Sequence, residues 1–144
     1  MKVIFLDVDG VLNSIPTIRQ FGHHFIDHIL VCLVERIVRE TGCSIILSSS
    51  WRQDARDKKL VDEALNMQGL SVRDCTPSIM GPTSTRADEI RDWISRNPVE
   101  KFAVIDDDDW ADTKDGNFFK TDEDRGLTVE IAERVIKHLS GMVN

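Results

Sequence analysis

The chain has 144 residues, of which 41% are hydrophobic and 30% charged, and its formal net charge is −7. This composition excludes collagen-like and disordered chains, and the length predicts a single domain over residues 1–144. The negative charge argues against a broad nucleic-acid-binding surface, although a nucleic-acid end could be a substrate if a metal neutralises some of the acids.

Apolar runs and helical periods alternate in the first half of the chain. Strands are expected at Val3–Leu6 and Ser44–Ser48, with a short one at Leu70–Val72. A helix between the first two strands is indicated by apolar residues at every fourth position: Phe25, Ile29, Leu33 and Ile37. Gly42 is its expected C-cap. A second helix ends near Gly69 and is marked by Leu60, Val61, Ala64 and Leu65.

The second half continues the alternation. A third helix must end before Pro98 and is marked by Ile90, Trp93 and Ile94. Strands follow at 102–105 and 118–119. A C-terminal helix has Thr128 as its N-cap and an apolar face made of Val129, Ala132, Ile136 and Leu139.

Strands that alternate with helices predict an α/β fold. We expect a three-layer Rossmann-like sandwich with a mostly parallel sheet of about five strands. The longest connections, Asn13–His24 and Arg73–Thr85, are too short for a second domain. No large cap domain is therefore expected.

The sequence also predicts a location for the protein. The first apolar run stops at Asp7, which is too early for a secretory signal, and no segment approaches the ~20 apolar residues that span a bilayer. The three cysteines, Cys32, Cys43 and Cys75, lack C-x-x-C spacing, which favours reduced thiols, two of them buried, over a zinc or redox site. We therefore expect a cytoplasmic protein with no membrane partner.

Polar residues follow three predicted strands directly, at the edge where open parallel sheets bind ligands. They are Asp7 and Asp9, Ser48 and Ser49, and Asp106 and Asp107. Side chains two positions apart share a face of an extended chain, so Asp7 and Asp9 should converge while Val8 packs in the core. Two carboxylates roughly 4 Å apart repel by about 4 kcal/mol at an effective dielectric of about 20, so a counter-charge is required. Oxygen-only ligands favour Mg²⁺.

Five further side chains have an ordinary structural role as an alternative to a functional one. Trp51 either packs in the core or offers a stacking platform for a base, and Arg52 either forms an ion pair within the fold or contacts substrate. His24 and His28 have the i, i+4 spacing of a metal pair, but no cysteine or acid completes a site, so exposed histidines are expected. Trp110 follows the acidic run, which it could shield, and has no assigned chemistry.

The joint order of these motifs resembles the haloacid dehalogenase (HAD) superfamily of phosphohydrolases over nearly the whole chain. Its four motifs are similar, in order, to Phe5–Val11, Ile46–Ser48, the region of Arg86 and Val104–Asp107. Leu47–Arg52 and Thr121–Thr128 are also similar to a small capless branch that includes HAD domains of RNA-repair proteins.

The resemblance implies a role for each catalytic residue. Asp7 would be the nucleophile that forms an aspartyl phosphate, and Asp9 the general acid and base. Ser48 and Arg86 would hold phosphoryl oxygens. Another basic residue such as Arg52 could share the role of Arg86.

The resemblance also implies the ligands of Mg²⁺. These would be Asp7, the backbone carbonyl of Asp9, Asp106, and Asp107 directly or through water; a register of Asp107 and Asp108 instead of Asp106 and Asp107 is the alternative. Ser49, Trp51 and Arg52 are the expected substrate-binding residues.

The predicted function is a Mg²⁺-dependent phosphatase, with nucleotides or nucleic-acid terminal phosphates as candidate substrates. Asp9 disfavours a dehalogenase, which does not need this acid, and the missing cap disfavours a mutase. A noncatalytic phosphate-binding or partner-binding module is the alternative. A phospho-accepting receiver domain ranks below both, because receivers carry their acidic pair after the first strand and the accepting Asp after a middle strand.

Overall fold

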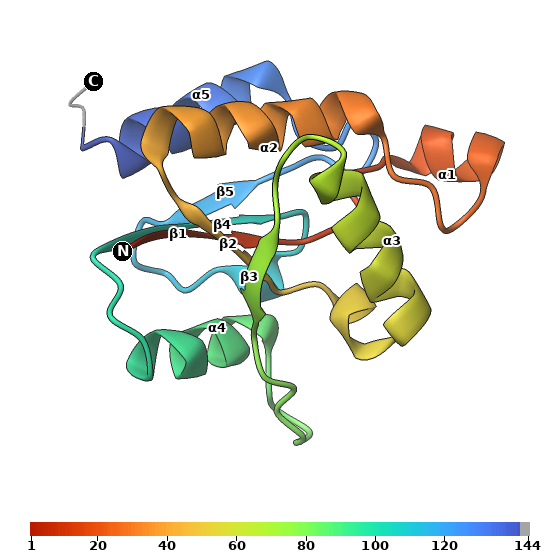
Figure 1. The fold of residues 1–144 in the computed structure, drawn as a ribbon. Helices are drawn as coiled ribbons and strands as arrows, with labels where there is room; N and C mark the ends of the chain where they lie inside the picture. The colour runs from red at the N-terminus through yellow and green to blue at the C-terminus, as the bar shows by residue number, and fades with distance from the viewer. Residues whose placement is uncertain (142–144) are drawn as a thin grey trace.

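The structure is a computed structural model that describes residues 1–141. Five parallel strands form one sheet in the order β3-β2-β1-β4-β5 (Figure 1). They are β1 (Lys2–Leu6), β2 (Ser44–Leu47), β3 (Val72–Cys75), β4 (Lys101–Asp106) and β5 (Phe118–Lys120). The predicted α/β fold with a parallel five-stranded sheet is confirmed.

Helices cover both faces of this sheet. They are α1 (Ile15–Phe21), α2 (His28–Thr41), α3 (Ala55–Asn66), α4 (Arg86–Ser95) and α5 (Val129–Leu139), with 3₁₀ turns η1 (Ser50–Gln53) and η2 (Asp109–Ala111). Figure 1 shows α2 and α5 side by side on one face and α4 on the opposite face. The three layers are thus those expected. Among residues 1–141 no segment forms a cap domain, and no helix is long and apolar enough to cross a bilayer.

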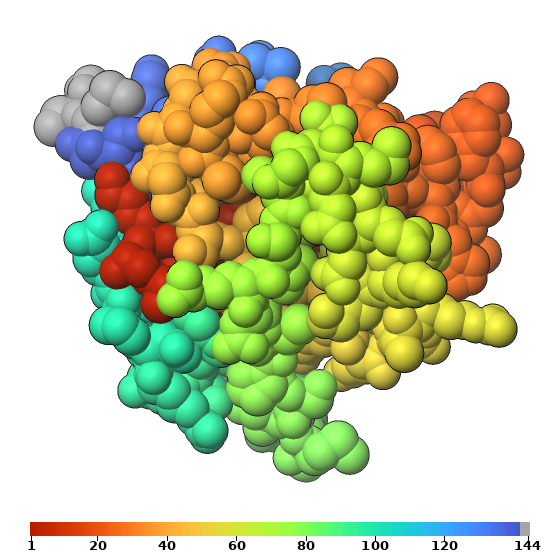
Figure 2. All heavy atoms as spheres, viewed as in Figure 1, coloured from red at the N-terminus to blue at the C-terminus, as the bar shows by residue number. Residues whose placement is uncertain are grey.

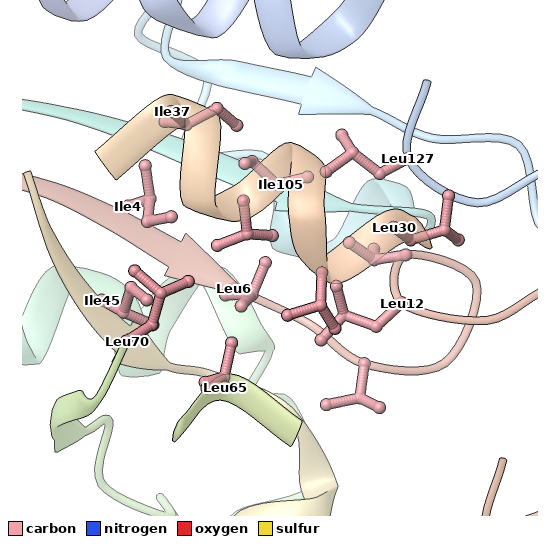
Figure 3. Packing of buried hydrophobic residues seen from close by; sticks show 14 of the residues in the cluster. Ile4, Leu6, Leu12, Leu30, Ile37, Ile45, Leu65, Leu70, Ile105 and Leu127 are labelled. Atoms are coloured by element: carbon pink, nitrogen blue, oxygen red, sulfur yellow. The ribbon is translucent and has the colours of Figure 1, made fainter. Parts of the chain in front are cut away.

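Strand alternation divides the core between the two faces. Ile4 and Leu6 of β1 pack with α2, α3 and α5, and Figure 3 shows them among Ile37, Ile45 and Ile105. The alternate residues of β1, Val3 and Phe5, lie on the other face and pack with Ile90 and Trp93 of α4. The Phe5 ring meets the Trp93 indole edge-on, with centroids 5.6 Å apart. The β1 strand is therefore buried on both sides, which explains its continuous apolar sequence.

The apolar period predicted for α2 was wrong in detail. The buried face consists of Leu30, Val31, Val34 and Ile37, whereas Ile29 is 74% exposed. An α-helix turns about 100° per residue, so a repeat of four drifts by about 40° at each step and leaves the core face. The helix begins after Asp27, whose side chain accepts a hydrogen bond from the Ile29 N–H, and ends at Gly42 as predicted.

Helix α1 was not predicted, because it has no buried residue and so no apolar period. Its polar signals were present in the sequence. Ser14 and Thr17 form a capping box, and Pro16 lies in the first turn.

The predicted strand at Leu70–Val72 lies two residues too early. Gly69 adopts a left-handed φ of 74°, and the Leu70 N–H donates to the Leu65 carbonyl, so Leu70 closes the end of α3. Strand β3 begins only at Val72.

The cysteines are free thiols, as expected, but only Cys43 is buried. Cys75 is half-buried and Cys32 is exposed on α2, so the prediction of two buried thiols was wrong.

Candidate active site

Three carboxylates meet at the carboxyl edge of the sheet. Asp7, Asp106 and Asp107 each offer an oxygen atom within 4.8 Å of the others. The cause is strand register: Leu6 pairs with Ile105 in parallel, and the Asp7 N–H donates to the Ile105 carbonyl at 3.1 Å. The chain thus leaves β1 and β4 side by side. Asp7 and Asp106 are buried, and Asp107 is partly exposed.

Arg86 lies against this acidic cluster of Asp7, Asp106 and Asp107. Its Nη1 donates to Asp106 Oδ2 at 2.7 Å and lies 3.2 Å from Asp7 Oδ1. It is the first residue of α4, whose start is fixed by a capping box between Thr85 and Asp88. Burial alone lowers the pKa of Arg86, but the charges of Asp7 and Asp106 more than offset this and raise it. Within residues 1–141, Nε and Nη2 of Arg86 make no hydrogen bond.

The cluster has three carboxyl groups but only Arg86 as a contacting cation within residues 1–141, and the pKa values of two of the carboxyls are raised. Burial, followed by the charge of Asp106, raises the pKa of Asp7 well above its usual value, although Arg86 opposes the shift. Burial and the neighbouring Asp106 raise the pKa of Asp107 to about 6. A further cation between these oxygens would favour the ionised form of both carboxyls.

Gly10 and Thr121 hold the two acidic loops together. Gly10 has a φ of 76°, and a Cβ at this position would collide with the Asp107 carboxylate, so only glycine permits the approach. Thr121 Oγ1 donates to the Gly10 carbonyl at 2.6 Å, and the Thr121 N–H donates to the Asp106 carbonyl at 2.9 Å. Sequence reasoning did not single out this role of Thr121, because its partner Gly10 lies 111 positions away.

The Asp9 carboxylate is positioned by a turn and not by the strand alternation that was predicted. Strand β1 ends at Leu6, and the Leu12 N–H donates to the Val8 carbonyl, so the chain turns and strand alternation does not apply to Asp9. Val8 is buried, as expected. The exposed Asp9 carboxylate accepts hydrogen bonds from Asn13 Nδ2 at Oδ1 and from Trp51 Nε1 at Oδ2, both at 3.0 Å. These two donors fix its orientation.

Asn13 is a second residue that the sequence did not reveal. It is buried, and its side-chain oxygen accepts from the Gly10 N–H at 2.9 Å while its amide reaches Asp9 and the Phe25 carbonyl. The short Gly10–Asn13 spacing of this turn was the available signal.

Ser48 follows β2 at the same edge. It is fully buried, and its N–H donates to the Leu6 carbonyl at 3.0 Å. Its Oγ has no hydrogen-bond partner among the described residues. A buried hydroxyl without a partner is costly, and a ligand oxygen would satisfy it.

Three of the side chains that follow Ser48 lie inside the fold, namely those of Ser49, Trp51 and Arg52. Ser49 Oγ accepts from the Trp51 N–H, and Trp51 is only 5% exposed, with its indole in the core. Arg52 is likewise 5% exposed in its side chain. All five of its N–H groups donate to internal acceptors: the carbonyls of Ser48, Ser49, Thr76 and Pro77 and the carboxylate of Glu89. Of the roles weighed from sequence, the geometry favours packing for Trp51 and an internal ion pair for Arg52, not substrate contact.

The other acids and the histidines lie outside the cluster. Asp108 caps η2 by accepting from the Trp110 N–H at 3.0 Å, so the geometry favours Asp106 and Asp107 in the predicted register.

His24 is exposed and pairs with Asp57 at 3.1 Å. Within residues 1–141 it joins no group of metal-type ligands with His28. Trp110 is 70% exposed.

Comparison with known proteins gives one match. A family model described as the HAD domain in Swiss Army Knife RNA repair proteins matches residues 3–132. This range contains every residue of the site described above. Neither the curated proteins nor the solved structures gave a match.

Proposed function

Since the chain belongs to the family of HAD domains in Swiss Army Knife RNA repair proteins, we propose that it is a Mg²⁺-dependent phosphomonoesterase that acts through an aspartyl phosphate. The family supports a phosphatase-type hydrolase on this fold. The observation that carries the proposal is the buried Asp7 paired with Arg86, at the same sheet edge as the Ser48 hydroxyl, which has no hydrogen-bond partner among the described residues.

The residues present fit a magnesium ion. Asp7, Asp106 and Asp107 supply carboxylate oxygens close together, and hard oxygen ligands are those that Mg²⁺ prefers. Their excess negative charge over Arg86 also calls for a cation. The Asp9 backbone carbonyl remains the fourth predicted ligand. When bound, Mg²⁺ would neutralise negative charge on Asp7 and on the phosphoryl oxygens.

Asp7 and Asp9 divide the chemistry into two balanced steps. An oxygen of Asp7 attacks phosphorus and forms a new P–O bond while the ester P–O bond breaks. Asp9 donates its proton to the leaving oxygen, and the alcohol departs. In the second step Asp9 takes a proton from a water molecule that attacks phosphorus, the bond to Asp7 breaks, and inorganic phosphate is released. Asn13 and Trp51 orient Asp9 for both transfers.

Two donors support the charge that develops on the phosphoryl group. Nε and Nη2 of Arg86 are free for phosphoryl oxygens, and the Ser48 hydroxyl has no internal partner within the described chain. Donors fixed in place before the reaction stabilise the transition state more than water does.

The proposed substrates are nucleotides or nucleic-acid terminal phosphates. The family's description places such domains in RNA repair proteins, and the absence of a cap domain over residues 1–141 leaves the sheet edge accessible to a large substrate.

A noncatalytic phosphate-binding module on the same fold is the second candidate. It is disfavoured because Asp9, which phosphate binding alone does not require, is held by two side-chain donors.

Hydrolysis of a chromogenic phosphate ester separates the two functions. We expect turnover with Mg²⁺ and none with EDTA. Asp7→Asn should abolish turnover while the protein stays folded by circular dichroism. Asp124→Asn, which removes the same charge from an exposed position, is the matched control and should retain activity. Binding of phosphate without turnover in the unmodified protein would support the module instead.

A further inference from the structure

A groove of about 650 Å³ lies next to Arg86, the arginine that contacts the acidic cluster. Residues of the β3–α4 connection and of η2 line it, among them Ile79, Pro82, Thr83, Asp108 and Trp110. Arg86 also lines it, and the same guanidinium contacts Asp7 and Asp106. Through Arg86 the groove thus adjoins the site proposed for the phosphoryl group. Its volume falls in the range of small-molecule sites. The connection that lines it projects from the body of the molecule (Figures 1 and 2).

Trp110 gives this groove an aromatic surface. It is 70% exposed, whereas Trp51 and Trp93 are 5% and 4% exposed. Its backbone is held by the cap of η2, because the backbone N–H of Trp110 donates to Oδ1 of the N-cap residue Asp108. Ile79 adds an exposed apolar side chain to the lining. An exposed indole in a groove beside a phosphate site is suited to stacking on a planar ring.

The charges of the groove lining disfavour a chain of phosphates. Arg86 is the only cation among the lining residues, and it is already paired with two acids. Glu89 and Asp108 add negative charge, although Glu89 is neutralised by Arg52. Binding of a polynucleotide backbone depends on several Lys or Arg contacts to phosphates, and this lining does not supply them. An uncharged ring system is the occupant that fits both the indole and the charge balance.

We propose that this groove binds the leaving group of the substrate, and that Trp110 stacks on its ring. The substrate class is then a small phosphate monoester whose leaving group is an uncharged planar ring system, such as a nucleoside, and not the end of a long polynucleotide. This inference rests on the proposed phosphatase function and narrows its substrates.

Two esters that share the phosphate but differ in the ring test the proposal. They are adenosine 5′-monophosphate and glycerol phosphate. Trp110→Ala should lower kcat/KM for the nucleotide about tenfold or more, mainly through KM, because base–aromatic stacking contributes that much. It should leave glycerol phosphate hydrolysis unchanged. Trp110→Phe should keep most of the preference.

Met80→Ala is the matched control, because Met80 is 95% exposed in the same connection but does not line the groove. It should change neither ester. An equal effect of Trp110→Ala on both esters, or no effect on the nucleotide, would overturn the inference. So would a 5′-phosphorylated oligonucleotide that is hydrolysed more efficiently than the mononucleotide at physiological salt.

Adenosine alone provides a readout that does not depend on catalysis. Saturation-transfer NMR should show its ring protons in contact with the protein, with the signal lost in Trp110→Ala and kept in Trp110→Phe and Met80→Ala. If adenosine binds in this way but no ester is hydrolysed, the proposed function fails while the groove assignment stands. If esters are hydrolysed but adenosine shows no Trp110-dependent contact, the inference fails alone.

Discussion

The two sides of the acidic cluster are built from the same residue types but differ in what those residues have left to bind. On the β2 side, Trp51 and Arg52 are buried, and every N–H of Arg52 is already bonded within the fold. On the β4 side, Trp110 is exposed, and Arg86 keeps two nitrogens free of hydrogen bonds within the described chain. Residue type alone therefore does not assign a tryptophan or arginine to substrate binding. Its burial and the hydrogen bonds that it already makes within the fold do.

The elements that follow each strand cause this difference. Turn η1 continues into α3, which packs Trp51 into the main core together with Val61 and Leu65. Turn η2 instead lies in the connection between β4 and β5; its Ala111 is buried with Ile90 and Trp93 of α4, but Trp110 remains at the surface. The side chains on the β2 side therefore stabilise the fold, whereas those on the β4 side remain available to a ligand.

Removal of Arg86 should have the largest effect on activity. Arg86→Ala should lower kcat roughly 10²–10³-fold, because loss of one fixed donor to a transition-state oxyanion has about this cost. Steady-state kinetics with a chromogenic ester at saturating Mg²⁺ would measure it. Arg86→Lys should recover part of the rate, since it restores the charge. A rate within twofold of the unmodified protein for Arg86→Ala would contradict the assignment of Arg86 to the phosphoryl group.

Removal of Arg52 should instead affect stability. Arg52→Ala removes the guanidinium donors to Glu89 and to four carbonyls, and breaking such a buried pair has a cost of about 3 kcal/mol in the free energy of unfolding. Urea denaturation would measure this loss. The KM of the folded variant should stay close to that of the unmodified protein. A large rise in KM with unchanged stability would indicate instead that Arg52 contacts the substrate.

Trp51→Phe tests whether the buried indole also positions Asp9. The change removes the Nε1–H bond to Asp9, and we expect kcat to fall about tenfold while KM is unchanged. The loss of stability should be about 1 kcal/mol. Trp93→Phe is the matched control, because it removes an indole bond to Asp74, away from the site, and should lower stability but not kcat. Equal effects of both variants on kcat would argue against a positioning role for Trp51.

The smallest effect concerns pH in the absence of metal. The pKa values of Asp7 and Asp107 are raised in the folded protein, the latter from 3.8 to about 6. The folded state therefore binds more protons than the unfolded state between these values, and stability falls as pH rises through this window. In EDTA the Tm should be higher at about pH 5 than at about pH 7.5. Asp107→Asn should flatten the difference. A Tm that rises with pH in EDTA would contradict the raised pKa values of Asp7 and Asp107 in the folded protein.

The sheet and the acidic cluster were predictable because both depend on local signals. Each of β1, β2 and β4 is a short apolar run that ends on a polar residue, and parallel strand order then brings Asp7 beside Asp106 without knowledge of any contact. Thr128 and Gly42 marked helix ends through capping chemistry that acts over a few residues.

The roles of Trp51, Arg52 and Thr121 were not predictable in the same way. Arg52 meets acceptors up to 37 positions away, and Thr121 meets Gly10 across most of the chain. Such contacts are decided by tertiary packing, which no short pattern encodes. The position of Asp9 was predicted from an extended chain. The structure instead has a turn there, in which the Leu12 N–H donates to the Val8 carbonyl, so strand alternation does not decide where Asp9 points.

Detection of a phosphoryl group on Asp7 would test the central claim most directly. The Asp9→Asn variant, which lacks the base for the second step, would be mixed with Mg²⁺ and an aryl phosphate whose good leaving group needs no proton. Rapid acid quench and mass spectrometry of the peptides would follow. We predict the added mass of one phosphoryl group on the peptide that contains Asp7, and its absence in Asp7→Asn. An unmodified Asp7 peptide together with continued turnover by Asp7→Asn would contradict the account.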